Sequence, residues 1–311
     1  MQLSFLQRLT LRQIDVFLAV CQHRSYSRAA EHLALTQPAV SSQIRSLEEL
    51  VRQPLFDYIG RQLYLTTAGE LVERAARDIK QRLVHLEIEL TEMDGRLSGT
   101  LNIAIETSAD YLLPSYIQRF CEQHPDAEVV LHVENHQRLL ARLQGNLDDL
   151  AVLTRVPGDS GLNFTPFAEH QLIAVARAGH PLAEQAEVTL LELLAYRLLS
   201  REAGSGSAQI FDEFCQQHSC VIKQRRQLGS NQAILHTLLL DSTTGDYAVL
   251  PRQAVEHAVS SGQLKPIAVS SMPIRRSWCS AYLRGKHLNP LAEAFIKILH
   301  APTVVTPQCI I

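Results

Sequence analysis

The feature that most restricts the fold of this sequence is a proline-free stretch from about Ala68 to Leu97. Its only glycines, Gly69 and Gly95, lie near its ends, so the stretch favours one continuous helix that begins at a Thr66 or Thr67 cap. Its apolar residues alternate in steps of four and three, at Ile79, Leu83, Leu86, Leu90, Met93 and Leu97. This spacing is typical of a helix that packs along a partner helix.

A helix of roughly 30 residues is ~45 Å long, which is too long for the short segment before it to cover. We therefore expect residues 68–97 to form a dimerisation helix, in which the six apolar residues make the contacts. The alternative is that this helix lies on the core of its own domain.

The segment before this helix has the pattern of a helix-turn-helix. A first helix is followed by a second, for which Ser27 is the expected N-cap. A third helix should open at Thr36 as N-cap, with Pro38 in its first turn. The third helix has one apolar face, and its other face carries polar groups that include Ser41 and Arg45. Such groups suit base edges and phosphates, so this helix is a candidate for reading DNA. The alternative is an ordinary surface helix with a polar face.

Beyond these helices, the sequence predicts short strands and helices in alternation. Two short strands around Gly60 are expected first. Further strands are expected at 100–105, 127–133, 150–153, 172–176, 196–199, 247–250, 264–268 and 278–283. Helices are expected at 114–123, 137–145, 190–195, 207–218, 231–240 and 289–300. This alternation indicates βαβ units, a mostly parallel sheet and an α/β fold.

The N-terminal residues match a known family in order. They are Ser27-Arg-Ala-Ala-Glu-His-Leu33, Leu35-Thr-Gln-Pro-Ala-Val-Ser41, Gln43-Ile44, Leu47-Glu48, Pro54-Leu-Phe56, Arg61 and Leu65-Thr-Thr-Ala-Gly69. This set resembles the LysR-type transcriptional regulators. The resemblance implies an all-α, winged helix-turn-helix domain over 10–67, a linker helix over 68–97 and a two-lobed α/β effector domain similar to periplasmic solute-binding proteins. One lobe would comprise 98–165 and 269–311, and the other 166–268.

By the same resemblance, one group of side chains would contact DNA. Those entering the major groove would be Gln37, Pro38, Ser41 and Ser42. Those contacting or orienting the backbone would be Ser27, Arg28, Thr36, Gln43 and Arg45. Arg61, in the wing turn, would reach the minor groove, where arginine favours narrow A·T-rich DNA. The family often has an arginine where this chain has Tyr58, which puts one wing contact to phosphate in doubt.

Three loops at the ends of expected strands qualify by position as an effector site. They contribute Thr107 and Ser108, then Arg201, Ser205, Gly206 and Ser207, and finally Ser230 and Asn231. Hydroxyls and helix N-termini suit an anion, and Arg201 would clamp a carboxylate or phosphate. Arg155 is a weaker candidate. The alternative is that Gly-Ser-Gly-Ser over 204–207 is only a turn and a helix cap.

These loops, with Arg284-Gly-Lys286, resemble the branch of the family that controls carbon-fixation operons. The resemblance implies an anionic effector such as a phosphorylated sugar, another phosphometabolite or a reduced nicotinamide nucleotide. It also implies a homodimer or homotetramer, an inverted-repeat DNA site with half-sites about one turn apart, and contact with RNA polymerase.

Three other functions are open to the sequence alone. An enzyme has little support, because no G-x-S-x-G, HExxH, P-loop or GxGxxG motif is present and His132 with His136 does not match a metal site. We expect no catalytic residue, metal or cofactor. By the same resemblance, a redox sensor of this family would carry its reactive cysteine in the loop after Glu202, whereas Cys215 lies on the helix that follows. A solute-binding protein would need export and would have no use for residues 1–97.

The net charge of −3 argues weakly against nucleic-acid binding. Residues 1–66, however, carry seven arginines against five carboxylates, or +2, which leaves −5 on the rest of the chain. The average therefore conceals a mildly basic DNA-facing segment and an acidic effector segment. Because no secretory signal, no run of about 18 apolar residues and no CxxC is visible, we expect a cytoplasmic protein without a membrane partner.

Overall fold

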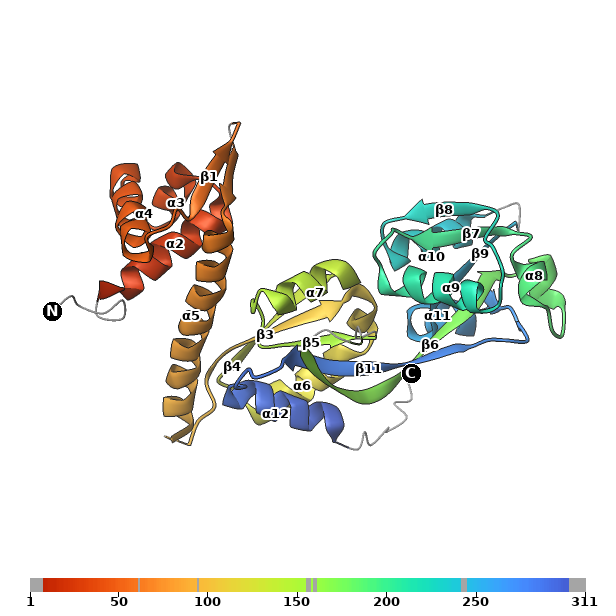
Figure 1. Cartoon of the computed structure of the whole chain (residues 1–311). Coiled ribbons are helices and arrows are strands. Elements are labelled where there is room, and N and C mark those ends of the chain that lie inside the picture. Colours follow the sequence, from red (N-terminus) through yellow and green to blue (C-terminus); the bar gives the residue numbers. More distant parts are fainter. Residues whose placement is uncertain are drawn as a thin grey trace. The chain divides into compact units, whose positions relative to one another are not determined.

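The computed structural model describes residues 8–60, 62–93, 95–154, 158, 161–241 and 245–301. The chain divides into two compact units, Met1–Glu87 and Ile88–Ile311 (Figure 1). Each unit has its own hydrophobic core. No helix among the described residues is both long and apolar enough to cross a membrane.

The first unit is a helical domain with a two-stranded hairpin. Its elements are α2 (Leu11–His23), α3 (Tyr26–His32), α4 (Gln37–Val51), β1 (Phe56–Ile59), β2 (Gln62–Leu65) and most of α5 (Thr67–Met93). The core lies between the helices and includes Phe17, Val40 and Ile44. Strands β1 and β2 pair antiparallel around Gly60, whose φ of +66° favours glycine at this turn. This arrangement confirms the predicted winged helix-turn-helix.

Side-chain caps determine where the short helices begin. The Thr36 hydroxyl accepts a hydrogen bond from the Ala39 amide at 3.4 Å, so α4 begins where the sequence predicted. The prediction that Ser27 caps α3 is wrong, because Ser25 is the cap and accepts from the Arg28 amide at 3.3 Å. The backbone of Ser25 is extended, as an N-cap requires, whereas Ser27 already lies within the helix.

Helix α5 begins after Thr66, whose hydroxyl accepts a hydrogen bond from the Gly69 amide at 3.0 Å. It ends at Met93, because Gly95 adopts a φ of +76° and its amide bonds back to the last turn. Leu97 therefore lies outside the helix and packs on the core of the second unit, which corrects its assignment to the dimerisation face. The other predicted residues lie on α5 and are exposed: Ile79, Leu83, Leu86, Leu90 and Met93.

The second unit is built on one nine-stranded sheet, in the order β4-β3-β5-β11-β6-β9-β7-β8, with β10 paired to β6. The strands are β3 (Gly99–Glu106), β4 (Ala127–Glu134), β5 (Leu150–Leu153), β6 (Leu162–Arg177), β7 (Arg197–Arg201), β8 (Arg225–Leu228), β9 (Asp246–Pro251), β10 (Leu264–Pro266) and β11 (Ile274–Leu283). The longer helices are α6 (Leu113–Gln123), α7 (His136–Gln144), α9 (Gly206–Gln217), α10 (Asn231–Leu240), α11 (Arg252–Ser260) and α12 (Pro290–His300). Single turns are η1 (Thr107–Tyr111), η2 (Pro181–Glu184) and α8 (Leu190–Leu193). The predicted α/β class is confirmed.

Its described core side chains form two clusters around β3 and β5 and two around β7 and β9, and we call these halves of the unit the first and second lobes. In the first lobe, α6 and α12 cover one face of the sheet and α7 covers the other (Figure 1). Neighbouring residues of β3 show this, because Ile103 packs with α6 and α12 while Ala104 packs with α7. In the second lobe, Leu198 of β7 packs with α8 and α9, and Leu199 packs with α10 and α11.

The expectation of a mostly parallel sheet is correct only for the outer strands. Strand β3 is parallel to β4 and β5, and β7 is parallel to β8 and β9. The long strands β6 and β11 join the lobes and pair antiparallel with each other, because the chain passes between the lobes in both directions. Both begin earlier than predicted, at Leu162 and Ile274, and neither β8 nor α11 was predicted.

Candidate DNA-binding and effector sites

Helix α4 buries Val40, Ile44 and Leu47 and leaves its polar face uncovered. The predicted DNA contacts that the structure describes are all at least partly exposed: Ser27, Arg28, Thr36, Gln37, Pro38, Ser41, Ser42, Gln43 and Arg45. Arg61 lies outside the described residues. The polar face of α4 is therefore accessible, and its contact with DNA stays a prediction.

An open groove of about 740 Å³ lies between the start of α3, the start of α4 and the hairpin. The predicted residues Ser27, Arg28 and Gln37 line it. Tyr58 and Gln62 of the hairpin line it as well, and Gln62 was not among the predicted contacts. The Tyr58 hydroxyl is a hydrogen-bond donor at the position where the family often has arginine.

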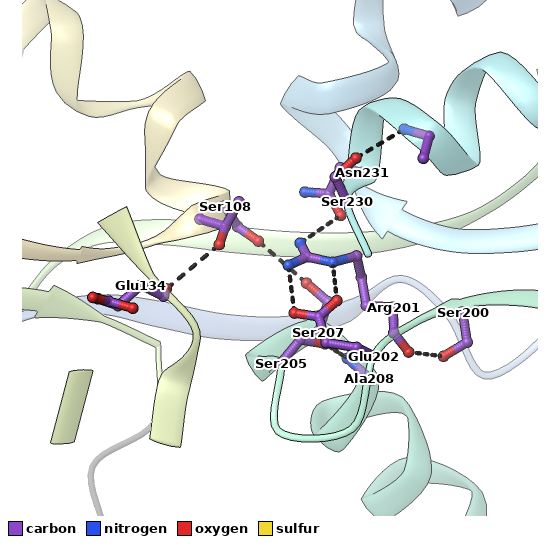
Figure 2. Close-up of polar contacts among 12 residues, drawn as sticks. Ser108, Glu134, Ser200, Arg201, Glu202, Ser205, Ser207, Ala208, Ser230 and Asn231 are labelled. Atoms are coloured by element: carbon purple, nitrogen blue, oxygen red, sulfur yellow. Dashed lines mark hydrogen bonds and ion pairs between the residues drawn. The ribbon is translucent and has the colours of Figure 1, made fainter. Parts of the chain in front are cut away.

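The three predicted effector loops meet beside the carboxyl ends of β3 and β7 (Figure 2). The Ser108 and Ser207 hydroxyls lie 3.2 Å apart and link η1 of the first lobe to α9 of the second lobe. Arg201 Nη1 donates to Asn231 Oδ1 at 3.2 Å, which links β7 to the start of α10. A small cavity of about 10 Å³ lies between the first two of these loops, with Gly206 also in its lining. The structure thus brings predicted residues of both lobes together.

Some of the predicted side chains already serve the fold. The hydroxyls of Ser205 and Ser230 cap α9 and α10, accepting backbone N–H groups at 3.3 and 3.0 Å. The Thr107 hydroxyl donates to the Glu134 carbonyl at 3.4 Å. For Ser205, the alternative that residues 204–207 form a turn and a helix cap therefore agrees with the structure. Arg155 lies outside the described residues.

Arg201 is not the free clamp that the sequence suggested. Its Nε and Nη2 donate to the Glu202 carboxylate at 2.8 and 2.9 Å, so its planar fork already holds a carboxylate. The physical reason is that the Arg201 side chain is buried and a buried guanidinium needs a counter-charge. A second acid, Asp110, lies nearby: burial raises the pKa of Asp110, and the Arg201 charge opposes part of this rise.

A buried carboxylate, Glu106, also faces the site and was missed as a site residue. Its Oε1 lies 2.6 Å from His136 Nδ1, and its Oε2 accepts from the Thr154 hydroxyl at 2.8 Å. A Cβ on Gly206 would lie 3.0 Å from Oε2, so the glycine allows the start of α9 to approach this acid. The sequence signal that could have identified Glu106 is an acidic residue at the end of a predicted strand. His136 pairs with Glu106 rather than with His132, and no metal-ligand cluster occurs within the described ranges.

Cys215 lies buried in α9, which bears on thiol-based sensing. Burial, with a smaller contribution from Asp212, raises the pKa of the Cys215 thiol to about 12. Because the thiolate is the form that reacts with oxidants, this environment disfavours a redox role.

Two family descriptions match this chain. Residues 11–70 match "Bacterial regulatory helix-turn-helix protein, lysR family", and residues 94–302 match "LysR substrate binding domain". The two matches correspond to the winged domain and to the two-lobed unit.

Curated relatives align over nearly the whole chain. The RuBisCO operon transcriptional regulator of Acidithiobacillus ferrooxidans is 37% identical over 294 residues, which cover 94% of each chain. The transcriptional activator CmpR of Synechocystis is 32% identical over 292 residues, which cover 94% of this chain and 95% of CmpR.

Solved structures agree with this assignment. The regulatory domain of Synechocystis CcmR, solved in complex with 2-PG, is 30% identical, with a TM-score of 0.62 over 67% of this chain and 99% of that domain. Full-length OxyR of Pseudomonas aeruginosa shares the fold, at 20% identity and a TM-score of 0.72 over 94% of this chain and 93% of OxyR. The chain therefore belongs to the LysR family and is a DNA-binding transcriptional regulator, not an enzyme.

Proposed function

We propose that this regulator binds a small anionic metabolite between the two lobes and that binding changes the geometry of promoter DNA. Arg201 carries this proposal, because it is a buried guanidinium where loops of both lobes meet. The Ser108 and Ser207 hydroxyls lie at the same junction and could donate to the oxygens of a carboxylate or phosphate. The CcmR domain solved with 2-PG and the relatives named for the RuBisCO operon support a metabolite of this class.

The assembly that we propose follows from the exposed face of α5. Two copies would pair along this helix, and contacts between effector domains would make a tetramer. The recognition helices of each dimer would then read an inverted repeat with half-sites about one turn apart. Closure of the lobes on the effector would shift the subunits and change DNA bending and contact with RNA polymerase. Because promoter DNA is the proposed target, we also propose that this regulator acts in the cytoplasm.

The domain limits form part of this proposal. They are 10–67 for DNA binding, 68–97 for the linker, 98–165 with 269–311 for the first effector lobe and 166–268 for the second. Isolated 98–311 would then bind the effector without binding DNA.

The test compares Arg201→Gln with Arg275→Gln, whose parent arginine forms an exposed ion pair with Glu169 at 2.6 Å. We expect 2-PG to bind the wild type in calorimetry and to change the mobility of its bent-DNA complex. Arg201→Gln should bind the same DNA but lose both effects of 2-PG, and Arg275→Gln should keep them. A full response of Arg201→Gln to 2-PG would contradict the proposed site.

A further inference from the structure

Arg201 and Glu202 form a two-bond ion pair directly after strand β7. Nε donates to Oε2 at 2.8 Å and Nη2 donates to Oε1 at 2.9 Å, so both oxygens are engaged (Figure 2). A further bond of the guanidinium runs from Nη1 to Asn231 Oδ1 at 3.2 Å. Glu202 therefore occupies the planar pair of donors that best matches a carboxylate or phosphate.

The two partners of this ion pair differ in burial. The Arg201 side chain is 5% exposed, whereas the Glu202 side chain is 34% exposed. Arg201 must keep a counter-charge, because an unpaired buried charge is costly. Glu202 can turn into solvent, where water would hydrate its carboxylate.

The loop around Glu202 allows its side chain to move without moving the chain. The Ser205 amide donates to the Glu202 carbonyl at 3.2 Å, and Gly204 turns the backbone with a φ of +90°. On the other side, Asn231 holds one edge of the guanidinium independently of Glu202. The fork would thus stay oriented when its carboxylate partner changes.

We propose that Glu202 is a built-in competitor of the effector, whose anionic group binds by replacing the Glu202 carboxylate on Nε and Nη2 of Arg201. This inference rests on the proposed function, which places the effector at Arg201. The exchange leaves Arg201 paired at every stage, which a neutral ligand could not do. Glu202 therefore determines both the selectivity for anions and the affinity.

The Glu202 carboxylate and the anionic ligand compete for the positive charge of Arg201. Burial is the largest single effect on Glu202 and opposes its ionisation. The hydrogen bonds from Arg201, a hydrogen bond from the Glu202 backbone amide and the Arg201 charge together outweigh it and hold the pKa of this carboxyl below its ordinary value. Near neutral pH, Glu202 is therefore a carboxylate. The nearby acid Glu106 is held by His136 and Thr154.

The test uses Glu202→Gln, which keeps the shape of the side chain and removes its charge. The matched control is Glu184→Gln, because Glu184 pairs with Lys265 at 2.8 Å on the exposed surface of the same lobe. Calorimetry with inorganic phosphate and with 2-PG should show about tenfold tighter binding by Glu202→Gln, or ~1.4 kcal/mol. Glu184→Gln should match the wild type. Equal or weaker binding by Glu202→Gln, or no binding of either anion by it, would overturn the proposal.

A melting experiment covers the case in which Glu202→Gln folds poorly. Loss of the counter-charge leaves Arg201 unpaired, so phosphate should raise the Tm of this variant more than that of the wild type. Glu202→Asp keeps the charge and should show a smaller gain. Equal shifts in wild type and Glu202→Gln would count against the exchange.

A DNA readout separates this inference from the proposed function. Suppose that Glu202→Gln binds anions more tightly but that neither anion alters DNA bending in any variant. The exchange is then supported and the effector role is refuted. Suppose instead that 2-PG alters bending with the same affinity in wild type and Glu202→Gln. The effector role is then supported and the exchange is refuted.

Discussion

Leu90→Ala should weaken the dimer that we propose along α5. Leu90 is one of five apolar residues in 3.5-residue spacing on this helix, and it is 54% exposed in the protomer. In a helix pair, the same leucine of both copies would be covered. Leu71 lies on the same helix outside this spacing and is 58% exposed, so Leu71→Ala is a matched control.

The magnitude follows from the area that remains to be covered. Full burial of a leucine side chain contributes about 1.5–3 kcal/mol. About half of Leu90 is still exposed, and each dimer contains two copies. Leu90→Ala should therefore cost about 2 kcal/mol per dimer, which raises the dimer Kd roughly 30-fold. Alanine is a strong helix former, so α5 itself should stay intact.

Sedimentation equilibrium over a range of protein concentrations measures this Kd directly. Leu71→Ala should give the wild-type value, and circular dichroism should show the same helix content in all three proteins. If Leu90→Ala and Leu71→Ala shift the equilibrium equally, or if neither shifts it, the spacing argument for dimerisation is refuted.

Two further predictions concern DNA reading and pH. Ser42→Ala should weaken binding to the specific site by about 1 kcal/mol relative to random DNA in fluorescence anisotropy, and equal losses on both DNAs would argue against base contact. Burial lowers the pKa of His170 to about 4, with a smaller opposing effect of Glu106, so the unfolded chain takes up this proton first as the pH falls. The contribution of neutral His170 to the free energy of unfolding is complete above pH ~6.5 and falls by about 2 kcal/mol between there and pH 4.5. His170→Phe can keep the ring contact to Trp278. Urea unfolding should show that this variant loses less unfolding free energy than the wild type as the pH falls to ~4.5, and the same pH profile in both proteins would contradict this.

Local signals allowed much of the fold to be predicted. Thr36 and the glycine at 95 determine helix ends through bonds to residues within one turn, so their effect is visible in the sequence. The choice between Ser25 and Ser27 as a cap depends on backbone angles that residue type alone does not give. Strand β8 has the sequence RRQL and lies at the edge of the sheet, where pairing with β7 rather than an apolar pattern makes it a strand.

The candidate site was less predictable because its chemistry depends on pairs. The sequence correctly selected the loops, since strand ends and helix starts can be read locally. It could not show that Arg201 is paired, because an adjacent carboxylate can point toward it or away from it. Similarly, Glu106 and His136 are 30 residues apart and meet only through the pairing of β3 with β4.

These pairings change the meaning of the net charge. The chain outside the first 66 residues carries −5, and acids lie close to the proposed anion site: Glu106, Asp110, Glu134 and Glu202. The negative potential of these acids would not attract anions from a distance. Electrostatic steering therefore cannot explain why the site binds an anionic effector. Selectivity must then arise at contact, where only a ligand able to replace a carboxylate on Arg201 gains a buried, doubly bonded partner. An acidic lobe and an anionic effector are therefore compatible, and together they predict that association is slow and that rising ionic strength, by screening the repulsion, speeds it.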